Sequence, residues 1–299
     1  MLPFKKILFP VDYSPSCTAM VPYVNDMIRH FSAELTLVHA FALRPAFINR
    51  DLEGVLVYSD VYSDPAYDPQ SLEEARLTED QRLREFAARM FPGYRAEVMA
   101  QEGEAGTVIH RVLEHQGADL VMMPTRGCGP LRRFLLGSVT AKVLHDVSAA
   151  VWTGIGSAIE AHAPTVPYKS IVCAVDQTDE AEVILRGAAA LAKSYQANLA
   201  LVHVLEMPPA TIEIDFSPYR KDLIDAAHAH LQGLKNRLNL DVPDIVIDAG
   251  LTGGIHEEVV RRKADLLIVG RGHDHGIVGR VWSRLYSIVR DSPCPVLSI

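Results

Sequence analysis

A carboxylate that directly follows an apolar run is the first feature of this sequence able to do chemistry. The run 7–11 is followed by Asp12 and, two residues later, Ser14. A carboxylate at the end of a strand can accept hydrogen bonds from a ribose hydroxyl or an adenine amino group. The alternative is structural, because Asp12 or Ser14 could also cap the helix that follows. The local sequence leaves both roles open.

A stretch with two glycines and several arginines is the second such feature. Gly127 follows the apolar run 120–123, and Gly137 and Ser138 open a helical segment ten residues later. Glycine lets the backbone approach a phosphate, and a helix N-terminus offers free amides and a positive dipole end. We expect Ser138 to cap this helix and to donate its hydroxyl to a phosphate oxygen. Nearby positive charge comes from Arg126, Arg132 and Arg133.

Signatures of other chemistries are missing from the sequence. It contains no P-loop and no Gly-x-Ser-x-Gly elbow, so we predict no catalytic residue. The cluster His273-Asp274-His275 has no third ligand at a fixed spacing, and we predict no metal site on the protein.

Composition excludes further classes. The 299 residues are 48% hydrophobic and 22% charged, which is typical of a globular protein, and the net charge is −8. No dense basic patch suggests nucleic acid, and no apolar run is long enough to span a membrane. The four cysteines are widely spaced, which favours reduced thiols and a cytoplasmic location over a disulfide framework.

The chain repeats itself. Residues 5–41 align without a gap on residues 169–205, and nine of the 37 pairs are identical. We therefore predict two copies of one domain, 1–154 and 169–299, joined by a linker at 155–168 that contains glycine and proline. The first copy has extra residues at about 41–70, for which a lid and a solvated surface loop are both open interpretations.

Each copy alternates short apolar runs with helical periodicity, which predicts an α/β fold. Strands are expected at 7–11, 35–40, 96–100, 120–123 and 149–153, and at 171–175, 199–205, 245–247, 266–269 and 296–299. Helices between them imply two tandem, doubly wound, open parallel sheets of five strands with helices on both faces. Pro22 is expected to kink the first helix or delay its start. We expect the last strands, 149–153 and 296–299, to pair and hold the copies together.

In order along the chain, Val-Asp, Leu-Val-His, Gly-Ala-Asp-Leu and Gly-x9-Gly-Ser-Val together resemble the universal stress protein family, and both copies match the family. The resemblance implies ATP, or ADP or AMP, as ligand in the first copy, with Mg²⁺ as an accompanying ion. It places Pro10, Val11 and Asp12 beside the adenosine and packs Ala40 and Met123 on the base. It sets Arg126, Gly127, Gly137, Ser138, Val139 and Thr140 around the phosphates.

Two departures from the family pattern bear on this site. Pro124 stands where ATP-binding members have their first motif glycine, and proline lacks an amide proton and fixes its own backbone. In the second copy the Gly-Ser pair is replaced by Trp282 and Ser283, which predicts no phosphate binding there in the usual pose.

The function expected from these observations is a stress-response sensor or regulator that binds an adenine nucleotide in its first domain. It is not an enzyme, and any ATP hydrolysis is expected to be slow and incidental. The alternative is a nucleotide-free interaction module whose two domains form a fixed pseudo-dimer. In either case we expect an unidentified protein partner, and the resemblance implies a homodimer.

Overall fold

The computed structural model describes residues 3–42, 69–125, 136–154, 165–178, 180–205, 219–271 and 278–299. The segment 273–275, where we predict no metal site, lies outside these ranges, as do most of the insertion and most of the linker. In the first half the elements are β1 (Lys6–Pro10), α1 (Pro15–Phe31), β2 (Glu34–Phe41), α2 (Pro69–Met90), β3 (Glu97–Glu102), α3 (Ala105–Gln116), β4 (Leu120–Pro124), α4 (Ser138–Asp146) and β5 (Ala150–Gly154).

The second half repeats this order. Its elements are β6 (Ser170–Ala174), α6 (Glu180–Tyr195), β7 (Asn198–Leu205), α7 (Arg220–Leu238), β8 (Asp244–Asp248), α8 (Leu251–Arg262), β9 (Leu266–Val269), α9 (Val278–Asp291) and β10 (Val296–Ser298). The predicted strands are all present. The expected delay at Pro22 is wrong, because α1 begins at Pro15 and continues through Pro22.

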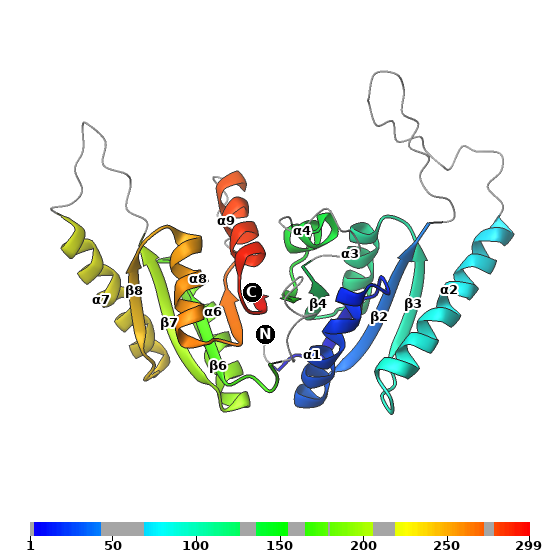
Figure 1. Cartoon of the computed structure of the whole chain (residues 1–299), viewed down its shortest axis with the longest axis horizontal. Helices are drawn as coiled ribbons and strands as arrows, with labels where there is room; N and C mark the ends of the chain where they lie inside the picture. The colour runs from blue at the N-terminus through cyan, green and yellow to red at the C-terminus, as the bar shows by residue number, and fades with distance from the viewer. Residues whose placement is uncertain are drawn as a thin grey trace, which may run out of the picture.

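The strands form one continuous sheet, with the order β3-β2-β1-β4-β5-β10-β9-β6-β7-β8. Within each half all neighbours are parallel, as predicted for a doubly wound fold. The halves meet where β5 and β10 pair antiparallel, which confirms the predicted pairing of the last strands. The two expected sheets are therefore halves of a single sheet, and Figure 1 shows one half on each side of the molecule.

The β5–β10 seam has an approximate two-fold axis. Trp152 lies opposite Leu297, and the two flanking pairs are Thr153 with Val296 and Val151 with Ser298. The Thr153 hydroxyl donates to the Val296 carbonyl at 3.3 Å, and the Ser298 hydroxyl donates to the Val151 carbonyl at 3.2 Å. These reciprocal hydrogen bonds satisfy hydroxyl groups that are buried in the seam.

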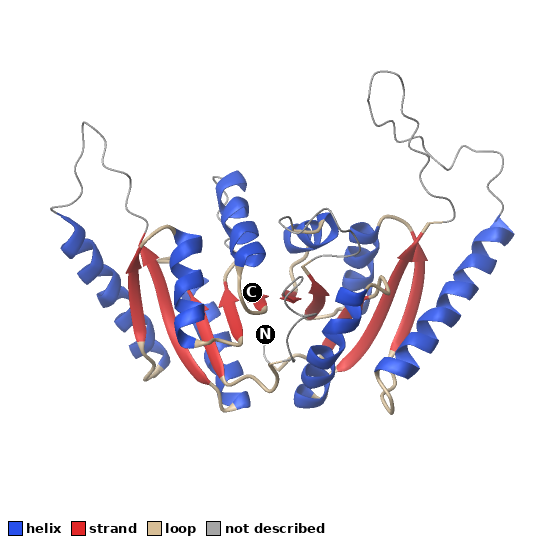
Figure 2. Ribbon diagram, in the orientation of Figure 1, coloured by secondary structure: helices blue, strands red, loops and turns tan. Residues whose placement is uncertain are grey.

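Helices cover both faces of the sheet, and each face has its own core (Figure 2). One core contains buried residues of α1, α2, α6 and α7, and the other contains buried residues of α3, α4, α8 and α9. Each core runs across the seam from one half to the other. In the described part of the chain, no helix is long and apolar enough to cross a membrane.

The topology also determines where a ligand can enter. In the first half β1 lies between β2 and β4, because the chain winds outward to β3 and then returns to the other side of β1. At such a switch point the loops after neighbouring strands diverge and leave a crevice at the carboxyl ends. The residues that follow β1 and β4 therefore border the expected ligand site.

Trp152 supports the seam and provides a test of it. Its side chain is fully buried, its indole N–H donates to the Tyr168 hydroxyl at 3.0 Å, and its ring lies 5.0 Å from that of Tyr23. Trp152→Ala should lower the free energy of unfolding by about 3–5 kcal/mol, because it leaves a cavity between the two halves. Urea denaturation followed by circular dichroism measures this. Leu77→Ala, at a side chain 54% exposed, is the control and should change stability by less than about 0.5 kcal/mol.

Candidate functional site

The end of β1 presents Asp12 toward solvent. Asp12 is exposed, and its Oδ1 accepts a hydrogen bond from the Ser14 amide at 2.9 Å. Ser14 is the N-cap of α1, and its hydroxyl accepts from the Cys17 amide at 3.0 Å. Of the two capping residues that the sequence allows, the structure therefore uses Ser14. Asp12 retains carboxylate lone pairs for a ligand, since one bond to Ser14 does not exhaust them.

The beginning of α4 differs from the expectation for Ser138. The N-cap is Gly137, which has no side chain, so no side-chain hydrogen bond caps the helix. The prediction that Ser138 caps α4 is wrong, because Ser138 is already the first helical residue and is exposed. Because Gly137 has no side chain, the N-cap residue offers the first amides of α4 no acceptor, and amides in this position suit an anion.

Two hydrogen bonds hold the start of α4 against the end of β4. The Gly137 amide donates to the Thr125 carbonyl at 2.8 Å, and the Thr140 hydroxyl donates to the Pro124 carbonyl at 3.0 Å. Thr140 is buried, so its role is to fix the helix. The structure thus brings Gly137, Ser138 and Thr140 to the edge of the sheet at which Asp12 lies.

The predicted base-packing residues lie on the α3–α4 face of this edge. Met123 is buried in the core of that face, and Ala40 and Val139 pack against the same core. Val11 is buried and belongs to the core of the opposite face, and Pro10 is half-buried. Arg126 and Gly127 lie outside the described residues, as does the rest of the loop 126–135.

The sequence did not indicate two further polar groups at this edge. The Thr125 side chain is 5% exposed, and its hydroxyl has no hydrogen-bond partner. Gln101 on β3 is paired in register with Ala40, and its Oε1 is likewise buried without a partner. Buried polar atoms are normally satisfied, so both groups are candidates for ligand contacts. No motif pointed to either of them.

On the α1–α2 face, a cluster around Tyr13 closes the ends of β1 and β2. The His39 Nδ1 lies 2.7 Å from the Val11 carbonyl, and the ring centroids of Tyr13 and His39 are 4.8 Å apart. The Arg82 guanidinium lies 4.1 Å from the centroid of Tyr13. Burial, together with the nearby Glu79 carboxylate, raises the pKa of Tyr13 to about 12. This cluster fixes the backbone beside Asp12, which supports a structural role for His39.

Pro124 is directed away from the predicted phosphate site. Its counterpart in the second half is Gly270, where an added Cβ would meet the Ile184 Cδ1 of α6 at 2.3 Å. The side-chain position at this point therefore faces the α1–α6 layer and not α4. The hydrogen bond to the Gly154 carbonyl of β5 is donated by the Thr125 amide. The pairing of β4 with β5 at this point therefore does not need an amide proton on Pro124.

The second half keeps the strand-end geometry of the first. Asp176 is exposed and accepts from the Thr178 amide at 3.0 Å, and the His203 Nδ1 lies 2.9 Å from the Val175 carbonyl. Residues 272–277 and the side chains of 278–283, with Trp282 among them, are not described. Arg271, the second residue after β9, is 8% exposed.

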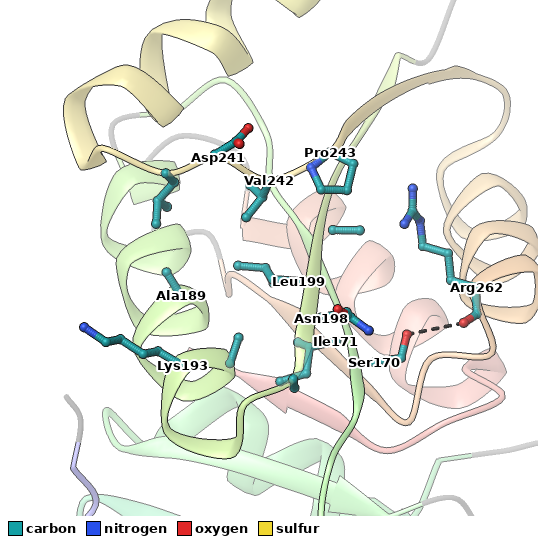
Figure 3. A pocket seen from close by; sticks show the side chains of 14 residues that line it. Ser170, Ile171, Ala189, Lys193, Asn198, Leu199, Asp241, Val242, Pro243 and Arg262 are labelled. Atoms are coloured by element: carbon teal, nitrogen blue, oxygen red, sulfur yellow. Dashed lines mark hydrogen bonds between the residues drawn. The ribbon is translucent and has the colours of Figure 1, made fainter.

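A groove of about 640 Å³ lies at the opposite edge of the sheet, at the amino ends of β6 and β7 (Figure 3). Lys193 and Arg262 lie on opposite sides of it, and Leu199 is one of the residues that line it. Because the groove lies at the amino ends of the strands, it is separate from the carboxyl ends that carry Asp12 and Asp176. At the corresponding edge of the first half, the hydroxyl of Tyr94 donates to the Ala33 carbonyl. Over the described ranges, no group of three His, Cys, Asp or Glu side chains is arranged to hold a metal ion.

The two hydroxyls of α4 should respond differently to mutation. Thr140→Val should lower the free energy of unfolding by about 1–3 kcal/mol, because it leaves the Pro124 carbonyl buried without its donor. Ser138→Ala should change stability by less than about 0.5 kcal/mol, because its side chain is exposed and caps nothing. Thermal and urea unfolding of both variants measure this. Equal losses of stability would contradict the assignment of Thr140 as the structural hydroxyl.

Comparison with known proteins places the fold. A universal stress protein structure from Archaeoglobus fulgidus superposes with a TM-score of 0.62 at 19% identity, and the match covers 98% of this chain and 95% of that one. A protein of unknown function from Pseudomonas aeruginosa PAO1 has a TM-score of 0.62 at 13% identity, and the match covers 99% and 92% of the two chains.

Sequence comparison agrees. A universal stress protein A homolog from Haemophilus ducreyi is 30% identical over 128 residues, which are 41% of this chain and 86% of that protein. Universal stress protein A from Salmonella typhimurium is 24% identical over 128 residues, 41% of this chain and 85% of that protein. The profile of the universal stress protein family matches twice, over residues 3–153 and 167–299. The chain therefore belongs to the universal stress protein family and carries two of its domains in tandem.

Proposed function

We propose that the first domain binds an adenine nucleotide, with ATP as the preferred ligand, and that the protein acts as a sensor or regulator in a stress response. The observation that carries this proposal is the start of α4, where amides with no side-chain cap, the exposed Ser138 hydroxyl and the unpartnered Thr125 hydroxyl meet at one strand end. Helix amides and hydroxyls are donors, and phosphate oxygens are acceptors.

The adenosine would lie along the ends of β1 and β2. The free lone pairs of Asp12 suit the ribose hydroxyls, and the base would pack between Ala40 and Met123. Gln101 is on the neighbouring strand beside Ala40, and its buried Oε1 is suited to accept a hydrogen bond from an exocyclic amino group. Pro124 is compatible with this arrangement because its side-chain position faces the other layer. Arg126 and Gly127 are proposed to complete the phosphate site from the adjoining loop.

The chemistry expected at this site is binding and not turnover. Residues 136–141 contain no carboxylate, so by themselves they do not fit a divalent cation, and we assign Mg²⁺ no role on the protein. The thiols of Cys17, Cys173 and Cys294 are buried and form no disulfide with one another, which suits a reducing compartment, and we propose that the protein acts in the cytoplasm. Nucleotide binding at the start of α4 would change the surface that the first domain offers to a partner.

Paired substitutions at equivalent positions test the ligand site. Asp12→Asn should raise the Kd for ATP about tenfold or more, because a hydrogen bond to a charged group is lost while the bond to Ser14 is kept. Asp176→Asn, at the same position of the second half, is the matched control and should leave the affinity unchanged. Isothermal titration calorimetry, fitted with one ATP site per chain, measures the Kd of both variants. An equal effect of the two substitutions would contradict binding in the first domain.

The phosphate end of the site has its own test. Acid release from freshly purified protein, followed by chromatography, should yield about one ATP per chain. Gly137→Trp should abolish it, because an indole at the N-cap blocks the approach of a phosphate to the amides of α4. A protein that carries no nucleotide and binds no added ATP would refute this function. The alternative would then remain, namely a nucleotide-free interaction module whose two domains are held as a fixed pseudo-dimer by the β5–β10 seam.

The proposed homodimer can be tested separately. The seam uses β5 and β10, so the free sheet edges are β3 and β8 at the two ends of the molecule. Light scattering should give twice the chain mass of 32.9 kDa. A mass of 32.9 kDa at micromolar concentration would show that one chain is the complete assembly.

A further inference from the structure

The helix α4 of the first half is held at its C-terminal end by a residue of the second half. The buried Arg271 guanidinium donates to the carbonyls of Val147, at 2.5 Å, of Ser148, at 3.1 Å, and of Ala149. These carbonyls follow the last turn of α4, whose C-cap is Val147. A cation at this end also interacts favourably with the helix dipole. A single side chain thus joins three consecutive carbonyls of the other half.

The N-terminal end of the same helix is also held from the second half. The Leu136 amide donates to the Tyr286 hydroxyl of α9 at 3.0 Å. Leu136 directly precedes Gly137, the N-cap of α4, and is itself 6% exposed. The peptide that leads into the start of α4 is therefore fixed by a side chain from the other domain.

The position of Arg271 in the repeat gives this arrangement its meaning. Arg271 follows β9 after Gly270, and in the repeat it corresponds to Thr125, which directly follows β4. The two amides make equivalent hydrogen bonds, Arg271 to the Ile299 carbonyl at 3.0 Å and Thr125 to the Gly154 carbonyl at 3.3 Å. In the first half this position carries a hydroxyl with no hydrogen-bond partner. In the second half it carries a side chain that reaches across the seam. The two halves have thus diverged at the strand end that borders the candidate phosphate site.

We propose that Arg271 and Tyr286 are positioning residues for the nucleotide site of the first domain, so that the second domain controls how tightly the first holds phosphate. This inference rests on the proposed function. The two contacts hold α4 at both ends against the second domain. The amides at its start then meet the phosphates without a cost of ordering the helix. By linkage, a bound triphosphate strengthens the interdomain contacts by the same factor.

Tyr286→Phe is the sharpest variant, because it removes one hydroxyl and keeps the ring. Its matched control is Tyr195→Phe, which also breaks an interdomain hydrogen bond, that of the Tyr195 hydroxyl to Asp26 at 2.6 Å. Tyr195 belongs to the core on the α1–α6 face, away from α4. At the other end of α4, Arg271→Met removes the donors and Arg271→Lys restores one charged donor group.

Affinities for ATP and for adenosine, measured side by side, separate positioning from general loss of structure. Tyr286→Phe should weaken the binding of ATP about threefold to tenfold and the binding of adenosine less than about twofold, because only the phosphates meet the start of α4. Tyr195→Phe should change neither affinity. Arg271→Met should lower the ATP-to-adenosine ratio further, and Arg271→Lys should recover part of it. Equal weakening of both ligands, or an unchanged ratio in all variants, would overturn the proposal.

Hydrogen exchange without ligand tests the contacts independently of nucleotide binding. Amides of Leu136 and the first turn of α4 should exchange faster in Tyr286→Phe than in wild type, and at the wild-type rate in Tyr195→Phe. Unchanged exchange in Tyr286→Phe would refute the positioning role even where ATP binds. If wild-type protein fails to bind ATP, the proposed function and the inferred control of affinity both fail, whatever the exchange result. If ATP binds with the same selectivity in every variant, only the inference fails.

Discussion

At the centre of the molecule β5 and β10 pair antiparallel, and both strands are buried along their whole length. If either strand were unpaired, its edge would expose a row of backbone donors and acceptors together with apolar side chains. Each half satisfies the edge of the other. Because Trp152 and Leu297 lie opposite each other on the approximate two-fold axis, the pairing also sets the relative orientation of the halves. Every other interdomain contact follows from this ladder.

The two faces of the sheet use the seam differently. On the α1–α6 face the contact is aromatic. The rings of His30 and Tyr195 stack at 3.7 Å, and Tyr168 lies 5.0 Å from Tyr195. Burial and the hydrogen bond to Asp26 raise the pKa of Tyr195 well above its ordinary range, so this hydroxyl remains a donor at physiological pH. On the α4–α9 face an apolar core also crosses the seam, and polar contacts there reach the backbone at both ends of α4. The aromatic face holds the halves together, and the polar face adjoins the candidate ligand site.

Fusion of the two copies allows them to differ. In a pair of identical chains, a residue at the position of Arg271 would occur on both sides and would replace Thr125 in the partner. A tandem chain can place arginine on one side and threonine on the other. The buried guanidinium is stabilised by three carbonyls, and burial lowers its pKa only to about 10, so it stays charged near neutral pH. The proposed ligand binding by the first half and the proposed support from the second are thus compatible within one chain.

The sequence by itself determined the repeat, the order of the elements and the strand ends that carry Asp12 and Asp176. It could do so because strands buried on both faces are continuously apolar and because a helix on a sheet repeats its apolar residues every three or four positions. Both signals are local. The sequence also indicated the pairing of the last strands, since an apolar edge must be covered.

Only the tertiary structure decided that Gly137, and not Ser138, caps α4, and that Arg271 reaches carbonyls about 120 residues earlier in the chain. It also decided that the side-chain position of Pro124 faces the α1–α6 layer and that the hydroxyl of Thr125 is buried without a partner. The physical reason is the same in each case. These contacts depend on the orientation that the β5–β10 ladder imposes on two distant segments, and no periodicity or motif within either segment records that orientation.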